Sequence, residues 1–121
     1  MFKLNITWSR FFSLTEENIK KNARESAGVY MLWIQLKSDE WMCFYVGRAK
    51  NVRERLLDHL SDSEPNEEIK EKVHKYNCGF EYAVISKEEN RVGVEKFLYD
   101  NFKPLCNESA PGGTAIEVNL P

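Results

Sequence analysis

Apolar and polar positions along the chain follow patterns that predict seven elements of secondary structure. Residues 28–34 and 41–46 are rich in β-branched and aromatic residues, and the polar segment 37–40 between them is a turn signal. Together they predict a β-hairpin. A third strand is predicted at 79–85 by the same criterion. Helices are predicted at 15–24, 51–60, 66–76 and from Ser86 to about Asn101.

Three of the predicted helices begin with a capping signal. Thr15 can cap the first, and the acidic residues that follow it suit the positive end of the helix dipole. The second opens on Asn51-x-x-Glu54, a variant of the capping box, and the last opens on Ser86-x-x-Glu89. These signals locate the helix starts.

The order of these elements, α-β-β-α-α-β-α, is followed by a loop and a short final strand or extended arm at 116–121. A hairpin followed by one later strand predicts a mixed α/β (α+β) fold, in which a small, mainly antiparallel, three-stranded sheet is flanked by helices. No internal repeat, low-complexity tract or Gly/Ser-rich linker interrupts the sequence. We therefore expect residues 1–121 to form a single domain.

The composition fits a small globular domain. A chain of 121 residues with 42% hydrophobic residues can bury one core. It has no run of eighteen apolar residues and no signal-peptide pattern, so we expect a soluble, cytoplasmic protein with no membrane partner. Cys43, Cys78 and Cys106 are odd in number, far apart and without a C-x-x-C pair, which predicts reduced structural residues.

The charge is unevenly distributed. The net charge of −2 argues weakly against a nucleic-acid partner. However, residues 1–60 carry ten Lys/Arg against seven Asp/Glu (+3), and residues 61–121 carry seven against twelve (−5). The acidic stretch 62–71 is interpreted as a solvated loop and helix face. The sharpest positive cluster consists of Arg48, Lys50, Arg53 and Arg55.

Candidate chemistry is concentrated around the second strand of the hairpin and the last helix. Gly47 would let the backbone turn sharply after Tyr45, so that Tyr45, Arg48 and the next helix converge at one end of the sheet. Arg55, one turn into that helix, could reach the same point, and its guanidinium suits phosphate geometry. Glu95 is a lone carboxylate among apolar neighbours, which calls for a partner or an ion.

Each of these residues also has a plainer interpretation. Tyr30 and Tyr45 could be core-edge tyrosines, and the positive cluster could be an ordinary solvated helix face. Glu95 could be exposed or could pair with Arg91 at i, i+4. His59 and His74 lack metal-ligand spacing. The residues by themselves therefore predict an anion site but no reaction.

A set of motifs in order resembles the GIY-YIG nuclease family. The first reads Gly28-Val29-Tyr30 and the second reads Tyr45-Val46-Gly47. Two tripeptides are a weak signal, but the continuation from Tyr45 to Leu56 is similar to the nuclease domain of the excision-repair incision subunit, with Arg55 eight positions after the motif glycine. The downstream matches are Glu95, the Lys103-Pro104 turn and Asn107.

The resemblance, which spans residues 28–107, implies a metal-dependent endonuclease that hydrolyses phosphodiester bonds in nucleic acid, with DNA favoured. It implies one Mg²⁺ or Mn²⁺ ion held by Glu95. Tyr45 would contact or activate the attacking water as general base, with Tyr30 assisting it by a hydrogen bond. A tyrosinate requires the metal and the arginines to lower its pKa. Arg55 would stabilise the phosphoryl oxygens.

The resemblance implies supporting roles for further residues. Arg48 occupies the position where a basic residue follows the second motif, and with Gly47 and Lys50 it is expected to contact substrate. Asn107 would brace the site by hydrogen bonds. His59 matches a histidine of some family members and is a candidate for proton transfer. The two motif tyrosines are fifteen positions apart, longer than is typical of the family, and we expect this to move the hairpin loop and not the site.

Two alternatives stay open. The chain could be a catalytically silent nucleic-acid-binding or protein-interaction module of the same fold. It could also be a scaffold that uses an aromatic surface around Trp8, Phe11 and Phe12, which the exposure of those rings would reveal. Because the chain shows no separate DNA-binding domain, we expect its grip on substrate to come from the domain itself, a homodimer or a protein partner.

Overall fold

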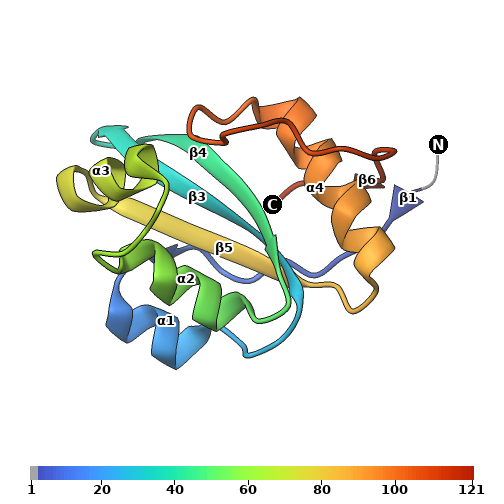
Figure 1. Ribbon diagram of the computed structural model, residues 1–121, viewed down its shortest axis with the longest axis horizontal. Helices are drawn as coiled ribbons and strands as arrows, with labels where there is room; N and C mark the ends of the chain where they lie inside the picture. Colours follow the sequence, from blue (N-terminus) through green and yellow to red (C-terminus); the bar gives the residue numbers. More distant parts are fainter. Residues whose placement is uncertain (1–2) are drawn as a thin grey trace.

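A computed structural model describes residues 3–121 and shows a four-stranded antiparallel sheet with helices on both faces (Figure 1). The strand order is β2-β5-β3-β4, and a separate two-stranded parallel sheet pairs β1 with β6. The strands are β1 (Lys3–Leu4), β2 (Phe12–Ser13), β3 (Gly28–Lys37), β4 (Glu40–Ala49), β5 (Cys78–Val84) and β6 (Glu117–Val118). The helices are α1 (Glu16–Asn22), α2 (Val52–Leu60), α3 (Glu67–Lys75) and α4 (Glu88–Phe102).

The sheet has one strand more than the sequence predicted. The extra strand is β2, which pairs antiparallel with β5 through Phe12 and Ser13. Two residues are too few to show the alternation of apolar and polar positions that identifies a strand, so its pairing depends on tertiary contacts. The mixed α/β class, the hairpin, the strand β5 and the four helices of the described chain agree with the prediction.

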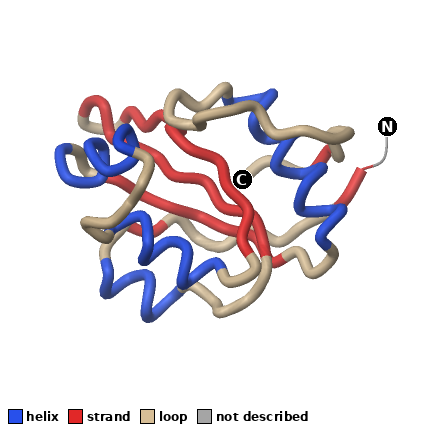
Figure 2. The backbone as a smooth tube through the Cα atoms, viewed as in Figure 1, coloured by secondary structure: helices blue, strands red, loops and turns tan. Residues whose placement is uncertain are grey.

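The sheet separates two apolar clusters. Helices α1, α2 and α3 contribute Ile19, Leu56 and Ile69 to the cluster on one face. On the other face, α4 contributes Val94 and Leu98. Figure 2 shows the strands running between these two groups of helices. The central strand β3 is buried on both faces, which explains its continuous apolar run.

Side-chain caps form at three helix starts. The side chains of Thr15, Asn51 and Asn66 accept hydrogen bonds from backbone N–H groups in the first turns of α1, α2 and α3. The capping box predicted at Ser86 is wrong, because α4 begins at Glu88 without a side-chain cap. The backbone carbonyl of Ser86 instead accepts a hydrogen bond from the Arg91 guanidinium at 2.8 Å.

The hairpin extends away from the motif tyrosines. Tyr30 pairs with Gly47 near one end of the ladder, whereas the turn lies beyond Lys37 and Glu40 at the other end. The turn between the two tyrosines therefore lies at the end of the ladder away from Tyr30 and Gly47.

Two further sequence predictions concern the cysteines and membranes. Cys43, Cys78 and Cys106 are all buried and free, as expected of reduced structural residues. Among residues 3–121, no helix has the length and apolarity needed to cross a bilayer.

Candidate active site

The ring of Tyr30 is fully buried on β3, and its position depends on Gly47. A Cβ atom on Gly47 would lie 2.4 Å from Cζ of Tyr30. The expected sharp turn at Gly47 is wrong, because β4 continues to Ala49. Glycine is required here because the Tyr30 ring occupies the space of a side chain.

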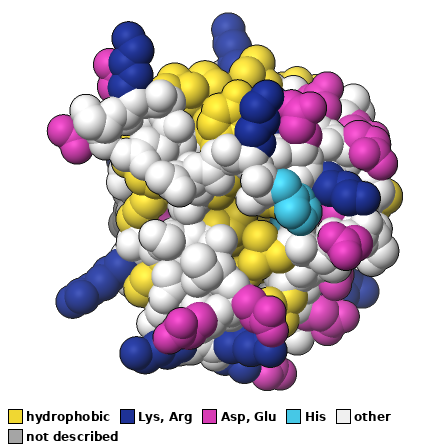
Figure 3. Space-filling view, turned by 90° about the vertical axis from the view of Figure 1, so that its left-hand side faces the viewer, with side chains coloured by type: hydrophobic (Ala, Val, Ile, Leu, Met, Phe, Trp, Pro, Cys, Tyr) yellow, Lys and Arg dark blue, Asp and Glu magenta, His cyan; other side chains and the backbone are white. Residues whose placement is uncertain are grey.

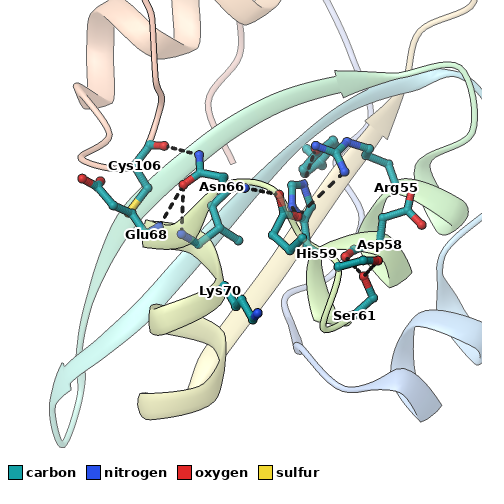
Figure 4. A network of polar contacts seen from close by, with 12 residues as sticks. Arg55, Asp58, His59, Ser61, Asn66, Glu68, Lys70 and Cys106 are labelled. Carbon is teal, nitrogen blue, oxygen red and sulfur yellow. Dashed lines mark hydrogen bonds and ion pairs between the residues drawn. The ribbon is translucent and has the colours of Figure 1, made fainter.

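A buried chain of polar contacts runs from Tyr30 to the loop before α3. The Tyr30 Oη atom lies 2.7 Å from Nε2 of His59. On the other side of the ring, Nδ1 of His59 lies 2.6 Å from Oε2 of Glu64. Oε1 of Glu64 accepts a hydrogen bond from the backbone N–H of Asn66 at 3.0 Å. Figure 4 shows His59 in the middle of this network, with Arg55 on one side and Asn66 on the other.

Glu64 corrects the interpretation of residues 62–71 as a solvated loop and helix face. Most of that stretch is exposed, but Glu64 is only 3% exposed. Its carboxylate is turned inward toward the backbone N–H of Asn66 in the loop and the His59 ring of α2, and Arg55 Nη1 lies 3.8 Å from Oε2. The sequence motifs gave no signal for this residue.

Tyr45 lies on the edge strand β4, next to this network. Its ring centroid is 6.1 Å from that of Tyr30 and 5.2 Å from that of His59. Burial raises the pKa of the Tyr45 hydroxyl, Glu95 raises it further, and the Arg55 guanidinium lowers it. Without a bound cation the Tyr45 hydroxyl is therefore protonated at neutral pH.

Glu95 points from α4 toward β4 and pairs with Arg48. Nη1 of Arg48 donates to Oε1 of Glu95 at 2.9 Å, and Glu95 is 9% exposed. Burial raises the pKa of Glu95, and the Arg48 guanidinium lowers it in part. The alternative pairing with Arg91 is wrong, because the Arg91 guanidinium donates to the carbonyls of Ile85 and Ser86.

The positive cluster of the sequence divides in the structure. Arg55 is half-buried beside Glu64, and Arg48 is exposed next to Glu95. Arg53 turns the other way, because its guanidinium donates to the backbone carbonyl of Ala23 at 2.7 Å and pairs with Glu25. The side chain of Lys50 is exposed.

Asn107 connects the segment after α4 to the edge strand. Its amide accepts from the backbone N–H of Val46 at 3.0 Å and donates to the Val46 carbonyl at 2.9 Å. Next to it, the carbonyl of Cys106 accepts a hydrogen bond from the Asn66 side chain at 2.8 Å. These contacts hold the segment against β4, where it forms one wall of a cleft of about 360 Å³. The cleft is lined by Tyr45, Arg48, Asn66, Glu95 and the segment 107–112.

The cleft fits a Mg²⁺ ion better than a metal that needs several protein ligands. Across residues 3–121, no group of three or more His, Cys, Asp or Glu side chains could hold an ion. Mg²⁺ retains several waters and is commonly bound through one or two carboxylates together with substrate phosphates. Glu95 supplies a carboxylate whose burial makes a cationic neighbour favourable. The donor set therefore fits a hydrated divalent cation.

The three aromatic residues near the N-terminus do not form one exposed surface. Trp8 donates its indole N–H to the backbone carbonyl of Asn119, and Phe12 packs on Phe80. Only Phe11 is exposed, at 43%, with its ring 4.9 Å from that of Trp41. Figure 3 shows the end of the molecule where the hairpin turns, with apolar side chains surrounded by charged ones. The scaffold alternative loses its main support.

The sequence of the site region matches a known family model. Residues 26–108 match the UvrC-like GIY-YIG domain. The chain belongs to this family. The matched region contains both tyrosine motifs, Arg55, Glu95 and Asn107, whereas residues 109–112 of the cleft wall follow it.

Relatives and solved structures agree with this family. The chain is 34% identical over 87 residues to UvrABC system protein C of Mycoplasmopsis agalactiae and 28% identical over 97 residues to that of Dictyoglomus thermophilum. These matches cover 72% and 80% of this chain but only 14% and 15% of those proteins. The chain therefore spans about one-seventh of their length.

A magnesium-bound crystal structure shows the same fold. The GIY-YIG N-terminal endonuclease domain of UvrC from Thermotoga maritima, bound to magnesium as its catalytic divalent cation, aligns with a TM-score of 0.58 and 25% identity. The alignment covers 77% of this chain and 99% of that domain. The chain is thus a GIY-YIG nuclease domain of the UvrC type, with relatives that use a divalent cation.

Proposed function

We propose that this GIY-YIG chain is a divalent-metal-dependent endonuclease that hydrolyses phosphodiester bonds in DNA. The observation that carries the proposal is the convergence on Tyr45 of two helices from opposite faces of the sheet. Glu95 of α4 lines the same cleft as Tyr45, and Arg55 of α2 lies beside Glu64, whose partner His59 packs against the Tyr45 ring. A general base, a phosphate-binding cation and a metal-binding carboxylate therefore meet at one edge of the sheet.

Each side chain of the site has a separate role in the hydrolysis. In the ionised form that a bound cation and Arg55 would favour, with its phenol proton lost to solvent, Tyr45 orients the attacking water and accepts its proton as the water oxygen bonds to phosphorus and the P–O bond to the leaving oxygen breaks. Arg55 donates to the phosphoryl oxygens, where negative charge grows in the transition state. Arg48, released from Glu95, provides a second guanidinium for phosphate. The leaving oxygen takes up a proton from solvent.

Glu95 would hold one Mg²⁺ or Mn²⁺ ion, and such an ion supplies Lewis-acid stabilisation to the scissile phosphate. Asn107 keeps the wall of the cleft in place through both polar groups of Val46. Tyr30 supports Tyr45 from the sheet interior, and His59 is the hydrogen-bond partner of Tyr30. Gly47 keeps the space for the Tyr30 ring open.

Two arginines of α2 form a matched pair for a test. Arg55→Ala should lower kcat by about 100-fold or more with little change in DNA affinity, because its contact strengthens in the transition state. Arg53→Ala should leave kcat near that of the wild type, since Arg53 faces Glu25 and not the cleft. Equal losses of kcat and affinity in Arg55→Ala would indicate simple phosphate binding and would contradict its proposed role.

DNA is the proposed substrate because the motif region is similar to that of the excision-repair incision subunit. Labelled single-stranded, duplex and branched DNA should be cut in Mg²⁺, and RNA of the same sequences should be cut more slowly. Preferential cutting of RNA would overturn this assignment. A homodimer or a protein partner is proposed to increase the affinity for substrate. The cytoplasm is the predicted location.

One observation favours a catalytically silent module as the second candidate. The Arg48 guanidinium engages the carboxylate that would hold the cation. If this ion pair persisted in the presence of Mg²⁺, the domain would bind nucleic acid without cutting it. Metal-independent DNA binding with no cleavage would support this second function.

A further inference from the structure

We propose that Glu64, which lies outside every motif of the family resemblance, is a positioning residue that fixes His59 as the Nδ1–H tautomer and thereby makes Tyr30 donate its hydroxyl proton to His59. The consequence for catalysis rests on the proposed nuclease function. The assignment of the His59 tautomer does not depend on that function.

The surroundings of the Glu64 carboxylate define its role as an acceptor. Oε1 accepts from the backbone N–H of Asn66 at 3.0 Å. Oε2 lies 2.6 Å from Nδ1 of His59 and 3.8 Å from Nη1 of Arg55. The Asn66 N–H faces one oxygen and the Arg55 guanidinium lies near the other, so an ionised carboxylate, which only accepts hydrogen bonds, fits both neighbours. Nδ1 of His59 must then carry a hydrogen, since two acceptors could not share a 2.6 Å contact.

The protonation of the other ring nitrogen of His59 follows from the charge of the imidazole ring. Burial is the main reason that the pKa of His59 falls to about 4, and the Arg55 guanidinium lowers it further, although Glu64 raises it. The ring is therefore neutral at pH 7. With its one hydrogen on Nδ1, Nε2 has only a lone pair. The Tyr30 hydroxyl, 2.7 Å away, must donate to it.

This arrangement gives the Tyr30 hydroxyl a defined direction. Its proton is engaged by His59 on the side of α2, so that only oxygen lone pairs remain for other contacts. Tyr45, whose ring lies 6.1 Å from that of Tyr30, is the neighbour toward the cleft. Tyr30 can therefore accept a hydrogen bond from that side but cannot donate one. In the opposite tautomer, Tyr30 would accept from Nε2–H and its proton would be free to point at the cleft.

The tautomer can be read from imidazole nitrogen chemical shifts. The chain contains two histidines, so His74→Gln leaves His59 as the source of every imidazole signal. In this background we expect a protonated Nδ1 and a bare Nε2 at pH 7. Glu64→Gln introduces an amide N–H that can donate to Nδ1, which should shift the ring toward the Nε2–H form. A wild-type ring with hydrogen on Nε2, or a tautomer unchanged by Glu64→Gln, would overturn the proposal.

Cleavage kinetics test the catalytic consequence. Glu64→Gln should lower kcat by at least about 10-fold while KM and Mg²⁺ affinity stay unchanged, because a wrong tautomer misdirects the neighbouring hydroxyl without removing a ligand. Glu67→Gln, an exposed residue of the same acidic stretch, is the matched control and should behave like the wild type. Unchanged kcat in Glu64→Gln would contradict the positioning role.

Two further measurements separate the possible failures. Glu64→Asp keeps the charge, so it should retain the Nδ1–H form and recover most of the kcat lost in Glu64→Gln. A loss as large as that of Glu64→Gln, with the tautomer retained, would count against the proposal. If the wild type cuts no DNA, the nuclease function fails, and the nitrogen shifts of the wild type still decide whether Glu64 fixes the tautomer.

Discussion

The ring of Tyr30 depends on the absence of a side chain at Gly47, and this gives a direct prediction. Gly47→Ala places a methyl group 2.4 Å from Cζ of Tyr30, whose ring is fully buried. We expect the free energy of unfolding to fall by about 1–3 kcal/mol, as for other overpacked cores. Urea denaturation measures this loss. Gly112→Ala is the control, because nothing lies within 4 Å of its added Cβ, and equal losses in both variants would contradict the account.

The buried ring of His59 predicts a loss of stability in mild acid. Its pKa is lowered from 6.5 to about 4, so the unfolded chain takes up a proton before the folded protein does. The contribution of the neutral His59 ring to the free energy of unfolding should therefore be complete above pH 6.5 and decrease as the pH falls toward 4. The groups around the ring are Tyr30, Tyr45, Arg55, Asp58 and Glu64.

Urea titrations at several pH values provide the measurement. His59→Gln should show a smaller decrease between pH 6.5 and 4 than the wild type. His74→Gln should follow the wild type, because His74 is exposed. Parallel pH profiles for wild type and His59→Gln would exclude a buried neutral ring at this position.

At the residue scale, the sequence identified the members of the site that belong to motifs. Tyr45, Glu95 and Asn107 were singled out by the resemblance to the GIY-YIG family, and the structure places all three on one cleft. Glu64 was not found, because nothing in an acidic stretch distinguishes the one carboxylate that turns inward. The role of Gly47 was misassigned for a related reason, since the ring that fills its space belongs to another strand.

At the scale of the elements, the C-terminus of α4 has an unfavourable residue. Lys103 caps the helix in the left-handed region, with φ 45°, and it precedes Pro104. A left-handed conformation costs an L-residue about 1–2 kcal/mol, and the proline ring also crowds a preceding Cβ. Lys103→Gly removes that Cβ, although glycine loses more entropy on folding.

We therefore expect Lys103→Gly to raise the free energy of unfolding by up to about 1 kcal/mol. Thermal or urea denaturation measures the gain. Lys96→Gly, in the interior of the same helix, is the comparison and should lower stability by about 1 kcal/mol. A destabilised Lys103→Gly would show that the left-handed cap is not under strain.

Sequence periodicity identified long elements and missed short ones. The stripe of apolar residues in α2 and the aromatic runs of the hairpin were sufficient to predict both. Strand β2 has two residues and joins the sheet through its backbone pairing with β5. Its formation depends on the position of a strand more than sixty residues later in the chain, which no local pattern records.

At the scale of the whole molecule, the fold explains why the site lies at β4. This strand is at the edge of the sheet, so helices from both faces can reach it. Helix α2, which carries Arg55, packs on one face and α4, which carries Glu95, on the other, and Asn107 holds the following segment against the same strand. An edge strand is also where an extended, charged substrate can approach the backbone without opening the core. The location of the cleft is thus a consequence of strand order.

The central claim, a metal-dependent nuclease centred on Glu95, is tested most directly by DNA cleavage. Labelled DNA substrates are incubated with wild type, Glu95→Gln and the control Glu89→Gln, an exposed residue of the same helix, in Mg²⁺ or in excess chelator. We predict cutting by the wild type and by Glu89→Gln in Mg²⁺, and none in chelator or by a folded Glu95→Gln. Cutting that persists in chelator or in Glu95→Gln would contradict the account.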